Sequence, residues 1–382
     1  MLNVILTASV SFIITFLAIP AIIKIAELKK LYDLPDARKL HTNPISSLGG
    51  IGIFGGFFLA SILSVSSGLH PEFQYFFAAS LIIFFLGIKD DLMVLSATKK
   101  FVGQVIAAAI LIHLAGIKIT SMHGFLGFTE LPEAFSLALS YITIIVIINA
   151  FNLIDGVDGL AGTLGMLTMT IFGSYFFMVG LEAYSILAFS LAGSLLAFLI
   201  FNYNPAKIFM GDSGSLVLGL INAILVIKFI TIADSVAAPF PIESAVAVGF
   251  AILMVPLSDT LRVFSIRIFQ GRSPFSPDRN HIHHLLLDRG LNHKYVTLSC
   301  LLLNMFFITV AYFGRALGPT WTMFTIVSLS VSGLGMLLYL KKPVRPVIAP
   351  YLNSNKTITE PSVQPFTRII PINSEAAVAE NN

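Results

Sequence analysis

The chain has 382 residues, of which 56% are hydrophobic and only 11% are charged, and its formal net charge is +3. A soluble globular domain carries roughly 25% charged residues, so this composition, with a mean hydropathy of +0.88, argues against a soluble domain and for a membrane protein. The single cysteine, Cys300, excludes a fold held together by disulfides.

Apolar segments of helical length follow one another along most of the chain. They lie near residues 2–26, 48–66, 72–89, 101–116, 136–154, 159–180, 183–202, 214–232, 244–268, 295–313 and 320–340. A helix of about 20 apolar residues crosses the ~30 Å hydrocarbon core of a bilayer. We therefore expect an all-α, polytopic integral membrane protein with about eleven transmembrane helices. The expected domains are a transmembrane domain over residues 1–340 and a polar, disordered cytoplasmic tail over residues 341–382.

Positive charges are unevenly distributed between the two sides that alternating spans define. Most lysines and arginines fall on one side, whereas the other side receives only Lys118, Lys228 and Arg315. The positive-inside rule therefore predicts an N-terminus outside the cell and a lysine-rich cytoplasmic side.

Five unusually polar motifs interrupt the apolar pattern, and all five fall on the predicted cytoplasmic side. They are DARKLHTNPISSLGG (36–50), GIKDDLMVLSATKKF (87–101), NAFNLIDGVDGL (149–160), NYNPAKIFMGDSGSL (202–216) and SPDRNHIHHLLLDRG (276–290). A transporter would be expected to carry ionisable groups near the middle of the membrane. Clustering at helix ends that face one compartment is typical of an enzyme that works at the membrane surface.

Two adjacent carboxylates, Asp90 and Asp91, end the third span. A helix C-terminus gives a carboxylate no favourable dipole, and neighbouring carboxylates repel unless a cation neutralises them. The pair therefore suits Mg²⁺, which takes one or two carboxylates plus substrate phosphates, or a general base. The alternative is a solvated turn in which Lys89 is the counter-charge.

The motif NAFNLIDGVDGL repeats a polar residue at every third position, with Asn149, Asn152, Asp155 and Asp158. On a continuous helix these residues would drift by about 180°, so they can face one site only if the glycines of the motif break the helix. The alternative for Asp158 alone is that it caps the N-terminus of the next helix.

The motif MGDSGSL places Asp212 at the start of the eighth span. There a carboxylate can hold a metal while backbone N–H groups face a phosphate. The alternative is that Asp212 or, more readily, Ser213 is an ordinary N-cap.

Three histidines, His281, His283 and His284, occupy four positions beside Arg279. They form a compact cationic or metal-binding patch, and we rank phosphate binding above zinc because no cysteine accompanies them. Asp259 and Arg262, inside the ninth span, are expected to form an i,i+3 pair that faces the protein interior. Their contact with substrate stays open.

The order of these motifs resembles that of the polyprenyl-phosphate N-acetylhexosamine-1-phosphate transferases, a membrane superfamily with WecA/TagO and MraY branches. The resemblance covers about residues 1–340 and rests on the DD pair, NAFNLIDGVDGLAG, NPAKIFMGDSGSL and HIHH. DARKLHTNPISSLGG and HIHH look like the WecA/TagO branch, because the MraY branch is expected to have a histidine where this chain has Ile282.

The resemblance implies transfer of N-acetylhexosamine 1-phosphate, most often GlcNAc 1-phosphate, from a UDP-sugar to undecaprenyl phosphate, with release of UMP. It implies a multi-pass protein of the bacterial cytoplasmic membrane that uses Mg²⁺, with Mn²⁺ as a substitute. We expect no nucleic-acid partner, and a homodimer is compatible with the helical surfaces. The alternatives are the MraY reaction with UDP-MurNAc-pentapeptide and, outside the enzyme class, a transporter or scramblase.

The resemblance also assigns roles to residues of the motifs. Candidate catalytic residues are Asp90, Asp91, Asp155, Asp158 and His281. Candidate substrate-binding residues are Lys100, Asn149, Asn152, Asn204, Arg279, His283 and His284. Candidate metal ligands are Asp212, Asp155 and Asp91. Direct attack by the lipid phosphate and a covalent aspartyl intermediate both stay open.

Overall fold

A computed structural model of the chain describes residues 1–31, 45–66, 68–235, 239–271 and 281–339, which belong to one compact unit. Several predicted features fall outside these residues. They are the proposed tail, residues 341–382, the substrate-binding candidate Arg279, and parts of two motifs, residues 36–44 and 276–280.

The described residues are mostly helical, as predicted. The helices are α1 (Leu2–Lys29), α2 (Gly49–Ser64), α3 (Glu72–Leu92), α4 (Ala97–Ala109) with the π-helical turn η1 (Ile110–Leu114), α5 (Glu133–Ile154), α6 (Leu160–Met178), α7 (Glu182–Asn202), α8 (Gly211–Ala233), α9 (Ala245–Ile252), α10 (Met254–Phe269), α11 (Ile282–Leu287), α12 (His293–Gly314) with the 3₁₀ turn η2 (Arg315–Leu317), and α13 (Pro319–Tyr339).

Each of the eleven predicted segments contains a helix. Among the described residues, eight helices are long and apolar enough to cross a membrane, or nine if the bent pair α9–α10 is one span. A polytopic, helical membrane protein is thus confirmed in outline, and the count of eleven stays a prediction. Helix α2, with 16 residues, is shorter than a typical span.

One element departs from the all-α expectation. Strands β1 (Ser121–Phe125) and β2 (Phe128–Glu130) form an antiparallel hairpin between η1 and α5. Its turn contains Gly127, with a φ of +81°, which a glycine adopts without steric cost. The backbone N–H of Leu126 donates to Thr320 Oγ1 at 2.7 Å, which ties the hairpin to α13.

The predicted ninth span is wrong as a single helix, because α9 and α10 meet at Leu253 with a bend of 83°. Pro256 lies in the first turn of α10, and a proline lacks the N–H that a continuous helix would need there. Asn304 of α12 bridges the break: its Oδ1 accepts from the Val255 N–H at 3.0 Å, and its Nδ2 donates to the Ile252 carbonyl at 2.9 Å.

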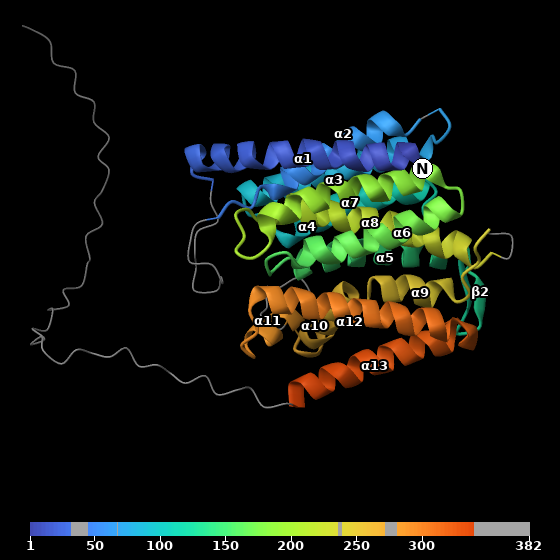
Figure 1. Ribbon diagram of the computed structural model, residues 1–382. Helices are drawn as coiled ribbons and strands as arrows, with labels where there is room; N and C mark the ends of the chain where they lie inside the picture. Colours follow the sequence, from blue (N-terminus) through green and yellow to red (C-terminus); the bar gives the residue numbers. More distant parts are fainter. Residues whose placement is uncertain (32–44, 67, 236–238, 272–280, 340–382) are drawn as a thin grey trace, which may run out of the picture. The chain divides into compact units, whose positions relative to one another are not determined.

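Helix α8 lies inside the bundle, with 83% of its most apolar stretch buried, and packs against α3 and α5 (Figure 1). Its first turn is close to α3, because a Cβ at Gly87 would lie 2.5 Å from Ser213 Cα. Gly211 opens α8 with a φ of +69°. These glycines allow the motif at the end of α3 to meet the motif at the start of α8.

The N-terminus of α1 and helix α11 lie at opposite ends of the bundle (Figure 1). The end with α11 is also the end at which α3 and α5 finish and α8 begins, because these helices share the site described below. The side of the membrane that this end faces stays a prediction.

Candidate active site

Four helix ends bring the acidic motifs together in what we call the aspartate cluster: Asp90, Asp91, Lys100, Asn152, Asp155 and Asp212. Lys100 Nζ donates to Asp212 Oδ2 at 2.7 Å and also pairs with Asp90 Oδ2. Asn152 Nδ2 donates to Asp212 Oδ1 at 2.9 Å. Residues from α3, α4, α5 and α8 thus converge on one carboxylate, and the predicted proximity of their motifs is confirmed.

Asp91 caps helix α8 from a different helix. Its Oδ1 accepts from the Asp212 N–H at 2.7 Å and its Oδ2 accepts from the Ser213 N–H at 3.0 Å. The expectation that this carboxylate gains nothing from a helix dipole was therefore wrong, because the positive end of α8 faces it. The N-cap alternative for Asp212 and Ser213 was also wrong, since the N-cap position is Met210 and no side chain of α8 caps it.

Asp155 follows the last residue of α5 and is half-buried. Helix α6 begins only after Gly159, whose φ is +75°, so the predicted break at the glycines is present. Burial and the charges of Asp212, Asp91 and Asp158 raise the pKa of Asp155 to about 8. Its carboxylate has no hydrogen bond or ion pair with any described residue.

The aspartate cluster therefore contains more acidic groups than basic ones. Four carboxylates meet one ammonium group, Lys100. Such an arrangement favours the binding of a cation, because each further positive charge relieves repulsion between the carboxylates.

Asp158 lies in the same motif but contacts another part of the fold. Its Oδ1 lies 3.1 Å from His293 Nδ1, and its Oδ2 accepts from Asn204 Nδ2 at 3.0 Å. Burial alone would raise the pKa of Asp158, but the hydrogen bonds and charge of His293, with the hydrogen bond from Asn204, lower it. The alternative that Asp158 caps α6 is wrong, because the N-cap is Gly159, whose N–H donates to Asn202 Oδ1 at 2.9 Å.

Asn149, a substrate-binding candidate, forms a reciprocal amide pair with Gln104 of α4. Asn149 Nδ2 donates to Gln104 Oε1 at 2.7 Å, and Gln104 Nε2 donates back to Asn149 Oδ1 at 3.3 Å. Gln104 is 1% exposed. The pair links α4 to α5 about one helical turn before Asn152 of the aspartate cluster.

A second group, which we call the histidine cluster, consists of Asp259, Arg262, His281, His283 and His284. His281 Nδ1 lies 2.8 Å from Asp259 Oδ2, and the Ile282 N–H donates to Asp259 Oδ1 at 2.7 Å. The predicted pair of Asp259 and Arg262 is present but longer, at 3.5 Å. Sequence reasoning missed the carboxylate–histidine contact, because the two residues are 22 positions apart.

His283 is buried, with 1% of its surface exposed. Burial lowers the pKa of His283 to about 3, so the expectation of a cationic side chain is wrong at this position. Its ring packs on the loop of the aspartate cluster, since a Cβ at Gly156 would lie 2.5 Å from His283 Nε2. His283 Nδ1 has no hydrogen-bond partner among the described residues. The two clusters are thus neighbours, and they meet at Gly156.

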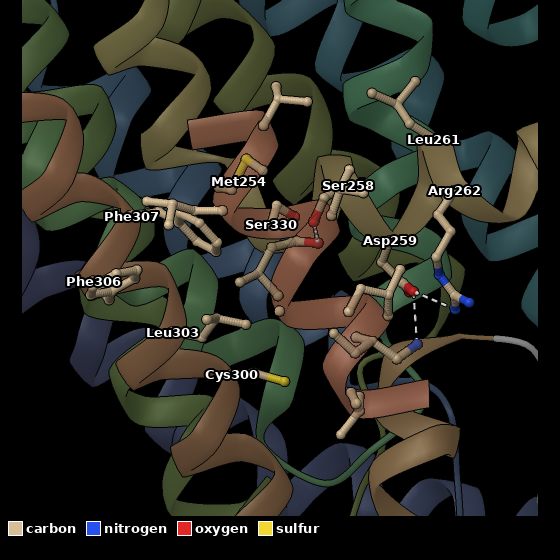
Figure 2. A pocket seen from close by; sticks show the side chains of 18 of the residues that line it. Met254, Ser258, Asp259, Leu261, Arg262, Cys300, Leu303, Phe306, Phe307 and Ser330 are labelled. Atoms are coloured by element: carbon tan, nitrogen blue, oxygen red, sulfur yellow. Dashed lines mark hydrogen bonds and ion pairs between the residues drawn. The ribbon is translucent and has the colours of Figure 1, made fainter. Parts of the chain in front are cut away.

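One apolar cavity adjoins the histidine cluster, and a second is lined by Phe101, the residue after Lys100. A cavity of about 830 Å³ lies between α10, α12 and α13; Figure 2 shows Asp259 and Arg262 at one end of it and Phe306 and Phe307 toward the other. A second apolar cavity, of about 340 Å³, lies between α4, α5 and α10 and includes Asn149 in its lining. Asp259, Arg262 and Asn149 therefore face room for an apolar chain.

The carboxylates of the aspartate cluster could supply only part of the coordination shell of Mg²⁺. Among the described residues, no three histidine, cysteine or acidic side chains are close enough to hold a metal together. Mg²⁺ usually takes one or two carboxylates and completes its shell with water and substrate phosphates. The proposed ligands Asp212, Asp155 and Asp91 therefore stay a prediction, and they would need a phosphate ligand to complete the coordination.

Fold and site together define a polytopic membrane enzyme with an acidic, lysine-containing centre of the kind suited to phosphoryl chemistry. The family model described as glycosyl transferase family 4 matches residues 73–230, which contain the whole aspartate cluster.

Three similar proteins cover most of the chain. The "Probable undecaprenyl-phosphate N-acetylglucosaminyl 1-phosphate transferase" of Bacillus subtilis is 33% identical over 80% of this chain and 84% of its own. The "Decaprenyl-phosphate N-acetylglucosaminephosphotransferase" of Mycobacterium tuberculosis is 33% identical over 80% of each chain. The "Undecaprenyl-phosphate alpha-N-acetylglucosaminyl 1-phosphate transferase" of Yersinia pestis is 28% identical over 85% of this chain and 90% of its own. The chain belongs to glycosyl transferase family 4.

Proposed function

We propose that this protein transfers N-acetylglucosamine 1-phosphate from UDP-N-acetylglucosamine to undecaprenyl phosphate and releases UMP, as the first membrane step of a cell-envelope polysaccharide. The observation that carries the proposal is the convergence of Asp90, Lys100 and Asp212, next along the chain to Phe101, which lines an apolar cavity. The names of the similar proteins support the same donor sugar and a polyprenyl phosphate acceptor.

The reaction exchanges one P–O bond for another. An oxygen of undecaprenyl phosphate attacks the β-phosphorus of the UDP-sugar, and the bond from that phosphorus to the oxygen shared with the α-phosphate breaks. UMP leaves with that oxygen, and the sugar remains on a lipid-linked pyrophosphate. No enzyme nucleophile is needed, because the acceptor already supplies an oxyanion.

Lys100 and Asp155 have complementary roles in this proposal. The Lys100 ammonium, held by Asp90 and Asp212, lies ready to neutralise charge on the diphosphate. The Asp155 carboxylate, unpaired among the described residues, is available to a cation or to the acceptor phosphate. Burial and nearby charge raise the pKa of Asp155, so the ionisation of its carboxyl group depends on what binds beside it.

Mg²⁺, when bound by Asp212 and Asp155 with Asp91 nearby, would neutralise the diphosphate and polarise its β-phosphorus. The oxygen donors and the excess negative charge of the aspartate cluster support this metal over zinc. Mn²⁺ has the same preference for oxygen ligands and is expected to substitute in part.

We also propose that the protein lies in the bacterial cytoplasmic membrane, with both clusters facing the cytoplasm. The asymmetry of lysine and arginine supports this orientation. In a Cys300→Ser background, an impermeant maleimide applied to intact cells should label Asn3→Cys and not Lys207→Cys. Both positions are exposed; Asn3 is in the first turn of α1, and Lys207 follows Ala206, whose N–H donates to Asp158 Oδ2 at 3.2 Å. The reverse labelling pattern would reject the orientation.

The activity is tested with purified protein, undecaprenyl phosphate, MgCl₂ and a panel of UDP-sugars, with UMP release as the readout. UDP-GlcNAc should be the best donor, EDTA should stop the reaction, and Mg²⁺ should restore it. Turnover of UDP-MurNAc-pentapeptide alone would favour the MraY-type reaction. The absence of turnover with every UDP-N-acetylhexosamine would reject the transferase, and nucleotide-independent solute or lipid flux in proteoliposomes would then favour a transporter or scramblase.

A further inference from the structure

Asp259 is a buried carboxylate for which the proposed reaction has no direct use. It is 3% exposed and lies inside α10. Both of its oxygens contact the segment that carries the histidines, through His281 Nδ1 at 2.8 Å and the Ile282 N–H at 2.7 Å. A buried carboxylate is costly unless it is well hydrogen-bonded, and these contacts are shorter than its contact with Arg262 at 3.5 Å.

The contact with Asp259 determines the hydrogen-bonding state of His281. An ionised carboxylate only accepts hydrogen bonds, so the ring nitrogen beside it, Nδ1, carries the proton. In the neutral imidazole the lone pair is then on Nε2, and in the imidazolium Nε2 is a donor. Either way one ring nitrogen is fixed and the other is left for a ligand.

Ring packing extends this effect to the aspartate cluster. The rings of His281 and His283 stack at a centroid distance of 5.5 Å and an interplanar angle of 9°. His283 in turn packs on Gly156, next to Asp155. A change in the position of His281 would therefore shift His283 and the loop that carries Asp155.

We propose that Asp259 is a positioning residue, which fixes the orientation and tautomer of His281 and holds the histidine segment against the turn at Gly156. The proposal rests on the proposed function in so far as His281 acts on the phosphates of the substrates. A merely structural Asp259 would stabilise the fold without affecting turnover through His281.

Two substitutions at Asp259 and one control separate these roles. Asp259→Asn keeps the size of the side chain, but its amide can donate to Nδ1 and so permits the other tautomer of His281. Asp259→Glu restores a carboxylate. Thr260→Val is the matched control, because Thr260 is the next residue, is 1% exposed, and has a hydroxyl without a partner among the described residues.

The kinetic test compares these variants of the full-length protein by UMP release. Asp259→Asn should lower kcat by about 10- to 100-fold, as loss of a group that orients a catalytic histidine does, and change the KM for UDP-GlcNAc by less than about threefold. Asp259→Glu should recover part of kcat, and Thr260→Val should stay within about twofold of the wild type. The variant Asp259→Asn combined with His281→Ala should be no slower than His281→Ala alone.

Three kinetic results would overturn the proposal. They are a normal kcat for Asp259→Asn, a change confined to KM, and a loss that multiplies with the loss from His281→Ala. Hydrogen exchange of the Ile282–Leu287 amides supplies a readout that needs no turnover. It should become about tenfold faster in Asp259→Asn than in Thr260→Val, and equal protection would reject the holding role. If the wild type released no UMP, the proposed function would fail while the exchange result would still judge the positioning of the segment.

Discussion

The aspartate cluster and the histidine cluster are neighbours built on opposite principles. In the aspartate cluster four carboxylates meet one lysine, and the pKa of Asp155 is raised to about 8 by burial and by the other carboxylates. In the histidine cluster Asp259 and His281 are 3% and 4% exposed and satisfy each other at 2.8 Å. The first is short of positive charge, whereas the second is largely complete within the protein.

This difference suggests different tasks. An excess of carboxylates at helix ends favours a site that binds a cation together with a diphosphate, because the cation relieves the repulsion between the carboxylates. A buried, hydrogen-bonded pair such as Asp259 and His281 favours a role in positioning, because its hydrogen bonds are present before any substrate binds. The comparison predicts that substitutions in the aspartate cluster mainly affect catalysis and substrate binding. Substitutions at hydrogen-bonded residues near it, such as Asp158 and Asn149, should mainly affect stability.

The largest effect is expected from Asp212→Asn. This change removes the carboxylate on which Lys100 and Asn152 converge, and it should lower kcat/KM by about 10³-fold or more with little change in thermal stability. UMP release and thermal unfolding in detergent measure the two quantities. Asp288→Asn, an exposed acidic position after α11, is the control and should stay within about twofold. Near-normal turnover of Asp212→Asn would contradict the assignment of the chemistry to the aspartate cluster.

A smaller loss is expected from Lys100→Met. Without the ammonium, Asp90 and Asp212 lose their shared counter-charge, so we expect a drop of about 100-fold in kcat/KM, mainly as a higher KM for UDP-GlcNAc. Lys100→Arg should be intermediate, since a planar guanidinium cannot replace a compact ammonium between two carboxylates. The control is Lys99→Met, because Lys99 is exposed and directly precedes Lys100. Equal losses for both lysine-to-methionine variants would show that overall charge, and not this contact, matters.

Asp158→Asn should chiefly affect stability. The hydrogen bonds of Asp158 with His293 and Asn204 lower its pKa, so the folded state gains from ionised Asp158 above the unfolded pKa of about 3.9 and loses this gain as pH falls through the lower, folded pKa. We expect a loss of about 1–3 kcal/mol at pH 7 that shrinks in acid. Thermal unfolding at pH 7 and at about pH 2 checks this, because the gain disappears only below the lowered pKa. A loss of activity as large as that expected for Asp212→Asn, with unchanged stability, would instead assign Asp158 to the chemistry.

The smallest effect is expected from Asn149→Leu. It breaks the amide pair with Gln104, and it should cost about 0.5–1.5 kcal/mol while kcat/KM stays within about threefold. The double variant Asn149→Leu with Gln104→Leu should recover stability, because neither amide is then left unpaired. A tenfold rise in KM at normal stability would restore Asn149 to substrate binding.

Much of the architecture could be predicted because local sequence determines it. Apolar length located a helix in each of the eleven segments, and the three-residue spacing of NAFNLIDGVDGL required the break that the structure has before Gly159. Charge asymmetry and motif order were enough to suggest one catalytic end. These features depend on residues close together in the chain.

The missed features depend on contacts between distant segments. Asp91 caps α8 across 121 positions, and His293 meets Asp158 across 135. The bend before α10 had a local signal in Pro256, but Asn304, which satisfies the broken backbone, lies 49 positions from Val255. Periodicity cannot reveal such partners, since the tertiary fold alone brings them together.

The most direct test of the central claim follows the β-phosphorus. The protein is incubated with undecaprenyl phosphate, Mg²⁺ and UDP-GlcNAc labelled with ³²P at the β-position, and the organic and aqueous phases are separated. Transfer of the sugar phosphate predicts that the label enters the lipid phase while unlabelled UMP appears in the aqueous phase, and that Asp212→Asn abolishes both. Label that stays in the aqueous phase as UDP, or as free GlcNAc 1-phosphate, would contradict the account.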